Sequence, residues 1–149
     1  MNPTRRLDLA EVEPVPVDPT ACRDLLRQAG SHLVSARTIA ADDPEGAFVL
    51  GYDGCRKAAL ATMLAVGTRP RGDAHHETTF NAAAAIAAKH LDDHDPVCRA
   101  LDDATDLRRV RHATQYCGET VAAEAATDAI DILAALLGDL SDLVDRLLP

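Results

Sequence analysis

The chain has 149 residues, of which 47% are hydrophobic and 26% charged, and this composition is typical of one globular domain. Aromatic residues make up only 3% of the chain and none is tryptophan, which excludes the base-stacking platforms of single-strand-binding proteins. The formal net charge of -9 excludes binding to nucleic acid or to an anionic membrane through bulk charge, so any contact with phosphate must be local.

The first 17 residues are predicted to form an extended, proline-rich arm outside the helical domain. Arg5 and Arg6 are followed by Glu11 and Glu13 rather than by an apolar run, so this segment does not resemble a signal peptide. No stretch of the sequence is long and apolar enough to span a bilayer. From these observations we expect a cytoplasmic protein without a membrane partner.

Residues 18–149 are predicted to form a single all-α domain, an antiparallel bundle of four to five helices. Asp18, Asp43 and Asp95 each stand directly before a proline, which is typical of an N-cap followed by the first helical position. Apolar residues then recur three or four positions apart, and alanine, a strong helix former, is abundant. The predicted helices cover residues 19–41, 44–66, 74–91, 96–116 and 119–148.

The cysteines and histidines give no sign of a metal or another cofactor. No two cysteines form a CxxC pair, so we expect four reduced, buried thiols at Cys22, Cys55, Cys98 and Cys117. The histidines leave two questions open. The pair 75–76 belongs to a helix-capping segment or to a loop near a cleft, and the pair 90 and 94 is a solvated helix end or a metal clasp.

The helix predicted over residues 96–116 carries the most informative pattern. Its apolar face, at Val97, Leu101 and Ala104, continues toward the C-terminus with polar and basic residues. Either the helix breaks near Thr105, or a buried stripe runs into a cationic patch that belongs to a cleft or a subunit interface. Such a patch would suit a phosphate, whose oxygens match the guanidinium fork. The patch consists of Arg108, Arg111, His112 and Gln115, with Tyr116 at its edge.

Two short segments resemble the motifs of the HEPN domain family. The family's second-helix signature, Tyr-Asp-x-x-Arg-Lys-Ala, is matched by residues 52–58, which read Tyr-Asp-Gly-Cys-Arg-Lys-Ala. Its Arg-polar-x-x-x-His motif near the last helix is similar to residues 107–116, which read Leu-Arg-Arg-Val-Arg-His-Ala-Thr-Gln-Tyr. The likeness spans roughly residues 18–148, through the order of the helices and these two motifs.

The resemblance implies a helical bundle that forms a homodimer, with the motifs of both protomers meeting at one cleft. Many HEPN domains are metal-independent ribonucleases of toxin–antitoxin, phage-defence or CRISPR systems. Others bind nucleotides or RNA without cleavage, or act beside nucleotidyltransferases. In the ribonucleases the motif arginine positions the phosphate, and the histidine is the acid–base group during attack by the ribose 2′-hydroxyl.

Residue by residue, Arg111 matches the motif arginine and His112 the polar position after it. Tyr116 stands where the ribonucleases have histidine, and with an ordinary pKa of about 10 a tyrosine is a poor general base at neutral pH. These three residues are the catalytic candidates. A shifted register, Arg108 with His112, keeps a histidine but shortens the motif by one residue. The candidates for phosphate binding are Arg108, Arg111 and Gln115.

We therefore expect a dimeric HEPN-like protein that binds a nucleotide or RNA through a degenerate ribonuclease motif. Two alternatives stay open: an active metal-independent endoribonuclease toxin, and a purely structural interaction module. In the structural module the arginines would pair across the interface with Asp102, Asp103 or Asp106. A role in a toxin–antitoxin or defence system, with a nucleotidyltransferase-type partner, follows from the resemblance alone.

Overall fold

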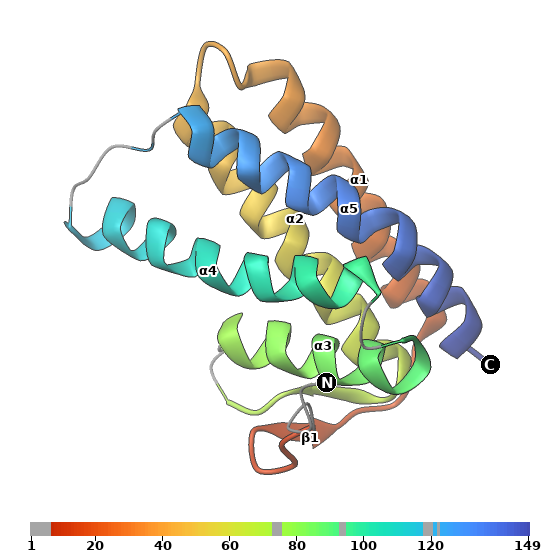
Figure 1. Ribbon diagram of the computed structural model, residues 1–149. Helices are drawn as coiled ribbons and strands as arrows, with labels where there is room; N and C mark the ends of the chain where they lie inside the picture. Colours follow the sequence, from red (N-terminus) through yellow and green to blue (C-terminus); the bar gives the residue numbers. More distant parts are fainter. Residues whose placement is uncertain (1–6, 73–75, 93–94, 118–120, 122) are drawn as a thin grey trace.

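The computed structural model describes residues 7–72, 76–92, 95–117, 121 and 123–149, without the side chains of residue 76 and residues 114–117. Within these ranges the chain forms five helices and two short strands (Figure 1). The expected all-α bundle is confirmed, and a small sheet is added to it. In chain order the elements are β1 (Val12–Pro14), α1 (Pro19–Ile39), α2 (Pro44–Ala65), β2 (Thr68–Pro70), α3 (His76–His90), α4 (Pro96–Cys117) and α5 (Ala123–Leu147).

Helix α2 is the centre of the bundle and contacts each of the other four helices. On one side α1 and α5 pack against it and against each other, and on the other side α3 and α4 form an antiparallel hairpin (Figure 1). Helix α4 also reaches α5, so the hairpin closes over α2.

The Asp-Pro starts of α1, α2 and α4 are confirmed at the atomic level. The carboxylates of Asp18, Asp43 and Asp95 each accept backbone N–H groups of the following first turn, with N···O distances of 2.9–3.2 Å. These bonds satisfy donors that no helical carbonyl can reach. At the other end of α2, Gly67 adopts a φ of 75°, a conformation that glycine alone adopts without strain. The chain can therefore turn from α2 directly into β2.

The hydrophobic core has an aromatic centre built by α2 and α3. Tyr52 is completely buried, and its ring lies 5.9 Å from that of Phe80 and 6.3 Å from that of Phe48, centroid to centroid. Alanine and leucine fill most of the remaining interior, which lets the helices approach closely. Three of the predicted thiols are free and buried, at Cys22, Cys55 and Cys98, whereas the side chain of Cys117 lies outside the described residues.

The predicted arm is not wholly separate from the helical domain. Strand β1 pairs antiparallel with β2, so that Glu13 lies opposite Arg69, and their side chains form an ion pair of 2.7 Å. Val12 is buried against Met63 of α2 and Ile86 of α3. The sequence did not predict this sheet, because strands of three residues are too short for an alternating pattern to stand out.

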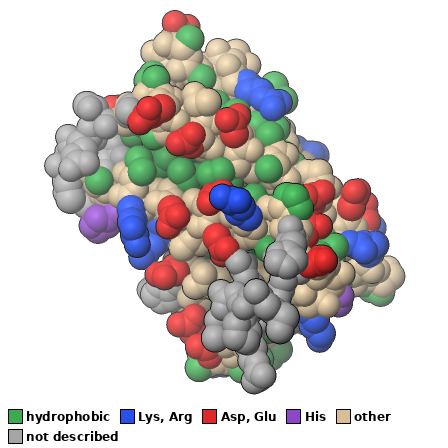
Figure 2. Space-filling model, viewed as in Figure 1, with side chains coloured by type: hydrophobic (Ala, Val, Ile, Leu, Met, Phe, Trp, Pro, Cys, Tyr) green, Lys and Arg blue, Asp and Glu red, His purple; other side chains and the backbone are tan. Residues whose placement is uncertain are grey.

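Acidic side chains are more numerous than basic ones on the face shown in Figure 2. Figure 2 shows carboxylates spread over the face seen in Figure 1, with fewer basic groups among them. In the part of the chain that the structure describes, no helix combines the length and the hydrophobicity needed to cross a membrane.

Candidate functional site

Helix α4 runs unbroken from Pro96 to Cys117, so it does not break near Thr105. The predicted apolar stripe is buried at Leu101 and Ala104, and Leu107, about one turn later, is buried as well. Arg111 comes next on this face and is half-buried. The first alternative, a break near Thr105, is therefore wrong. Of the cationic patch in the second alternative, only Arg111 is partly buried at the end of the stripe, whereas Arg108 and His112 are exposed.

Arg111 lies over the aromatic ring of Tyr52, with its guanidinium carbon 5.0 Å from the ring centroid. A guanidinium at this distance is attracted by the negative face of the ring. Because Tyr52 is completely buried and held by neighbouring aromatic rings, it gives Arg111 a rigid platform. The two segments that carry the HEPN resemblance thus meet in space, although they are far apart in the sequence.

Three arginines act on the Tyr52 hydroxyl. Burial raises the pKa of Tyr52 to about 12, and the positive charges of Arg111, Arg108 and Arg56 oppose this rise. Charges act on a titrating group strongly only when they are near it. Two arginines from α4 and one from α2 therefore act on the same buried phenol, and Arg111 is the one that lies over its ring.

The other predicted residues of α4 do not all point the same way. Arg108 is exposed and forms an ion pair of 3.1 Å with Glu77 of α3. His112 is also exposed, while Arg111 faces α2. The backbone of α4 passes through residues 115 and 116, but the side chains of Gln115 and Tyr116 lie outside the described residues.

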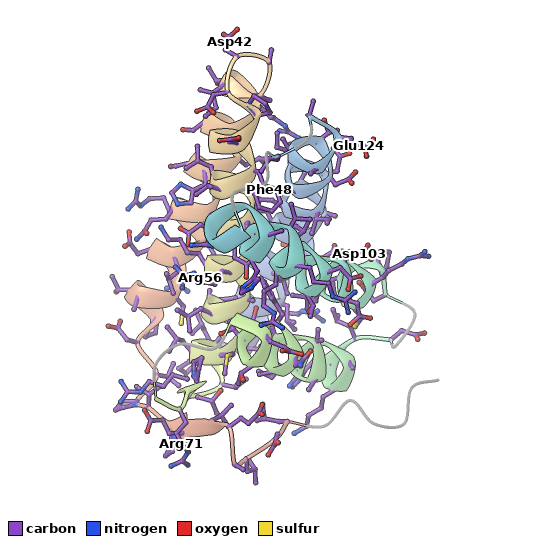
Figure 3. The ribbon with its side chains drawn as sticks, turned by 90° about the vertical axis from the view of Figure 1, so that its left-hand side faces the viewer. Asp42, Phe48, Arg56, Arg71, Asp103 and Glu124 are labelled. Carbon is purple, nitrogen blue, oxygen red and sulfur yellow. The ribbon has the colours of Figure 1, made fainter. Side chains whose placement is uncertain are left out.

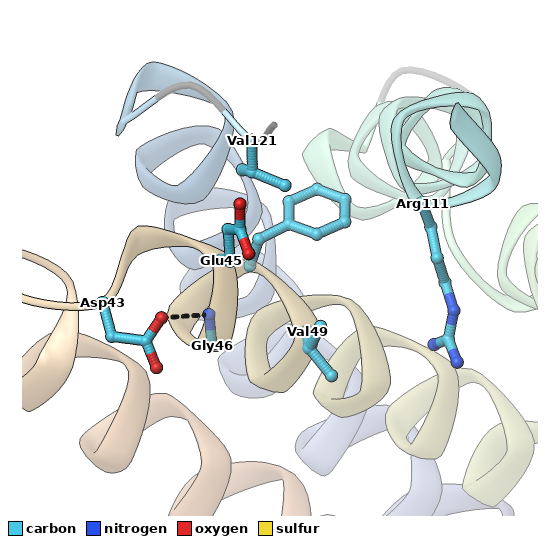
Figure 4. Close-up of a pocket in the computed structure, with 7 residues that line it drawn as sticks. Asp43, Glu45, Gly46, Val49, Arg111 and Val121 are labelled. Carbon is cyan, nitrogen blue, oxygen red and sulfur yellow. Dashed lines mark hydrogen bonds between the residues drawn. The ribbon is translucent and has the colours of Figure 1, made fainter. Parts of the chain in front are cut away.

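A pocket of about 530 Å³ opens beside Arg111, within the size range of small-molecule sites. It lies where the N-terminal end of α2 approaches α4 and the start of α5. Figure 4 shows Arg111 at one end of the pocket and Asp43 at the other, with Val49 between them. The lining residues are Asp43, Glu45, Gly46, Phe48, Val49, Arg111 and Val121.

The two ends of this pocket differ in charge. Arg111 offers a cation at one end, and the exposed carboxylates of Asp43 and Glu45 offer hydrogen-bond acceptors at the other. One oxygen of Asp43 is already used by the N–H of Gly46. The middle is apolar, because the side chain of Val49 is half exposed there. Such a pocket suits a ligand with an anionic end, an apolar body and hydrogen-bond donors.

A second charged cluster joins α1 to α2 and contains a residue that the sequence analysis did not single out. Asp53 pairs with Arg56 at 2.9 Å and with Lys57 at 3.3 Å. Nε2 of His32, from α1, lies 3.2 Å from the Asp53 carboxylate and 3.0 Å from the Lys57 ammonium. Burial pushes the pKa of Asp53 upward, but the charge of Arg56 and the hydrogen bonds from Arg56 and Lys57 hold it below its ordinary value.

The position of His32 could have been found from the helix hairpin. His32 lies seven residues before Ile39, the end of α1, and Asp53 lies nine residues after Pro44, the start of α2. In an antiparallel hairpin with a short turn, positions at similar distances from the turn lie opposite each other. Without this argument, a single histidine on a helix does not by itself indicate a functional site.

Of the histidines not yet placed, only His90 has a described side chain. His90 is exposed at the end of α3, as expected of a solvated helix end, whereas His75, His94 and the side chain of His76 lie outside the described residues. Among the residues that the structure describes, no three His, Cys, Asp or Glu side chains are grouped so that they could hold a metal ion.

Comparisons of the chain with protein-family models, with characterised proteins and with solved structures give no match. The proposals below are therefore supported by the residues and their geometry, together with the resemblance of the two motifs.

Proposed function

We propose that this protein binds a nucleotide or RNA, with a phosphate held at Arg111. The observation that carries the proposal is that the half-buried guanidinium of Arg111 stands on the ring of Tyr52 at the end of a ligand-sized pocket. A guanidinium held in this way has little conformational freedom left to lose on binding. Its fork also matches two phosphate oxygens. Arg108 and Arg56 add positive charge nearby.

The rest of the pocket suits the remainder of a nucleotide. With the phosphate at Arg111, the sugar and base would extend toward the N-terminal end of α2. The apolar side chains of Val49 and Val121 would contact the flat faces of the base. The carboxylates of Asp43 and Glu45 would accept hydrogen bonds from ribose hydroxyls or amino groups, and they would repel a phosphate placed at that end.

The test is a binding titration of the full chain with AMP, UMP and single-stranded RNA. Replacing Arg111 with alanine is expected to lower the affinity at least about tenfold, which is the loss of one charge-assisted hydrogen bond or more. Arg109→Ala is the matched control, because Arg109 is the exposed neighbour two positions away on the same helix. If Arg111→Ala binds as tightly as the wild-type chain, Arg111 is not the phosphate ligand. That result would favour the alternative of a purely structural interaction module.

Ribonuclease activity is the second candidate function, and it depends on His112. This histidine is exposed on α4, directly after Arg111 and one turn after Arg108. It could take a proton from a ribose 2′-hydroxyl if the RNA lay along the outer side of α4. Incubation with RNA in EDTA distinguishes the two functions, because cleavage would leave 2′,3′-cyclic phosphate ends and would be lost in His112→Ala.

The proposal includes a homodimer, as the HEPN resemblance implies. Sedimentation of the purified chain at several concentrations measures its mass directly. A monomer at all concentrations would remove the shared cleft from the proposal, and the pocket beside Arg111 would then act within one chain.

A further inference from the structure

We propose that the site continues along α2 to a second phosphate subsite formed by His32, Arg56 and Lys57, so that the ligand is a single-stranded oligonucleotide. This inference rests on the proposed function, because its first phosphate is the one bound by Arg111. It goes further by naming the class of ligand, which carries at least two phosphates joined through a ribose.

The two subsites are connected by one exposed stripe of α2. Glu45, Val49, Asp53 and Arg56 recur at spacings of four, four and three residues, which places them on one side of the helix. On this side Glu45 and the apolar Val49 are exposed and Asp53 and Arg56 are partly exposed, and we call this side of α2 the groove. Figure 3 shows Arg56 on α2 between α1 and α4, further along α2 than Phe48. A ligand that leaves the pocket at Arg111 would therefore meet Arg56 next.

The second cluster carries more positive than negative charge. The single carboxylate of Asp53 is shared by Arg56, Lys57 and His32, so at least one positive charge is left over even when the imidazole is neutral. These side chains keep 16–27% of their surface exposed. They are buried enough to be held in place and open enough to accept an anion from the groove. Asp53 therefore acts as a positioning residue for the cations around it.

Arg56 links the two subsites. Its guanidinium donates to the carboxylate of Asp53 at 2.9–3.0 Å, and its charge also acts on the hydroxyl of Tyr52 beneath Arg111. Lys57 follows Tyr52, over which Arg111 lies, by five residues, so the backbone positions below the two subsites are about 7–8 Å apart along the axis of α2. The two phosphates of a pyrophosphate share one bridging oxygen and cannot be so far apart. Neighbouring phosphates of a strand are separated by a ribose and can reach both subsites.

The ligand is expected to be recognised through its backbone rather than by base stacking. Phe48, Tyr52 and Phe80 are all buried, so none of the described aromatic side chains offers an exposed face. A base that enters the pocket beside Arg111 must also be unpaired, since the pocket has room for a small molecule and not for a duplex. A single strand with little sequence preference meets both conditions.

The experiment compares ligands with one phosphate, with a pyrophosphate and with two phosphates on a strand. The probes are AMP, ADP and the phosphorylated dinucleotide pApA, together with UMP, UDP and pUpU, titrated against the full chain by calorimetry. Lys57→Met is expected to lower the affinity for the dinucleotides about tenfold, which corresponds to the loss of one charge-assisted hydrogen bond. The affinities for the mononucleotides and the diphosphates should change less than twofold. The salt dependence of dinucleotide binding should also become shallower.

Lys89→Met is the matched control, because it removes the same group from the exposed C-terminal turn of α3, away from the groove. His32→Gln is a second variant, which should also weaken the dinucleotides selectively if Lys57→Met unfolds the chain, as circular dichroism would reveal. The second subsite would be overturned if Lys57→Met lowered the affinity for mononucleotides and dinucleotides equally, or lowered the affinity for dinucleotides no more than Lys89→Met does. Unchanged binding by Arg111→Ala would instead remove the proposed function.

Discussion

Tyr52 is the residue on which the geometry of the site depends. Its ring contacts two aromatic side chains in the core on one side and supports Arg111 on the other. Burying the hydroxyl of a tyrosine costs little free energy only when the hydroxyl is hydrogen-bonded or lies close to a favourable charge. The cluster of arginines supplies such charge, so one side chain connects the packing of the core to the chemistry of the groove.

The buried phenol of Tyr52 predicts a loss of stability at alkaline pH. In the unfolded chain Tyr52 loses its proton near pH 10, while the folded chain holds it until about pH 12, so stability falls as the pH rises between these values. At about 1.4 kcal/mol per pKa unit, Tyr52 accounts for a loss of about 2–3 kcal/mol. Replacing Tyr52 with phenylalanine should make the decline that much smaller, as measured by denaturant unfolding across this range.

Cys55 also contributes to the loss of stability at alkaline pH, in the wild-type chain and in Tyr52→Phe alike. Burial also raises the pKa of the Cys55 thiol to about 12, so both proteins lose stability as the pH rises above about 9. Only the difference between the wild-type chain and Tyr52→Phe belongs to the phenol. Parallel curves would mean that Tyr52 is not buried in the folded protein.

At the level of elements, α2 is a helix built from small residues. Gly51 lies against α5 so closely that a Cβ added to it would be 3.0 Å from the Cβ of Ala129 and 3.2 Å from its carbonyl carbon. Gly54 meets Leu133 of the same helix in a similar way. These glycines let α5 approach α2 on one side, while the opposite side of α2 is left for the groove.

Gly51→Ala is therefore expected to destabilise the protein by about 1–3 kcal/mol, because the backbone of α5 must move away to admit the methyl group. The matched substitution Gly138→Ala should stabilise it by about 0.5–1 kcal/mol, because nothing lies within 4 Å of the added Cβ and alanine favours the helix. Thermal and urea unfolding of the two variants measure these opposite signs. Stabilisation by both would show that α2 and α5 are further apart than described.

Local rules predict the helices well and the contacts between them poorly. The first residues of α1, α2 and α4 agree with the Asp-Pro signals, since a cap is a contact within a few residues of itself. Helical periodicity predicts that the apolar face of α4 continues with Arg108, Arg111 and His112, of which only Arg111 is partly buried. It could not predict that Arg111 would stand on Tyr52 or that Arg108 would pair with Glu77, because these contacts depend on how α4 packs on α2 and α3.

For the whole molecule, the net charge of -9 and the basic groove have opposite effects on an anionic strand. The excess of acidic side chains would repel the strand, whereas Arg111 over Tyr52 and the pair Arg56 and Lys57 on α2 would attract it. Under the proposed function this contrast would favour one orientation of the strand and suppress binding elsewhere on the surface. The small number of cations would then limit affinity, but not where the strand binds.

The N-terminal arm is expected to contribute to the stability of the whole fold. Val12 is 4% exposed and packs on α2 and α3, and its strand is tied to β2 by the hydrogen bond from the Arg71 N–H to the Glu11 carbonyl, at 2.8 Å. Val12→Ala should therefore cost about 1–3 kcal/mol of unfolding free energy and reduce the hydrogen-exchange protection of the Arg71 amide. Leu9→Ala is the matched control, because Leu9 is 75% exposed and its loss should change stability by less than about 0.5 kcal/mol. Equal effects of the two substitutions would mean that the arm lies on the bundle without stabilising it.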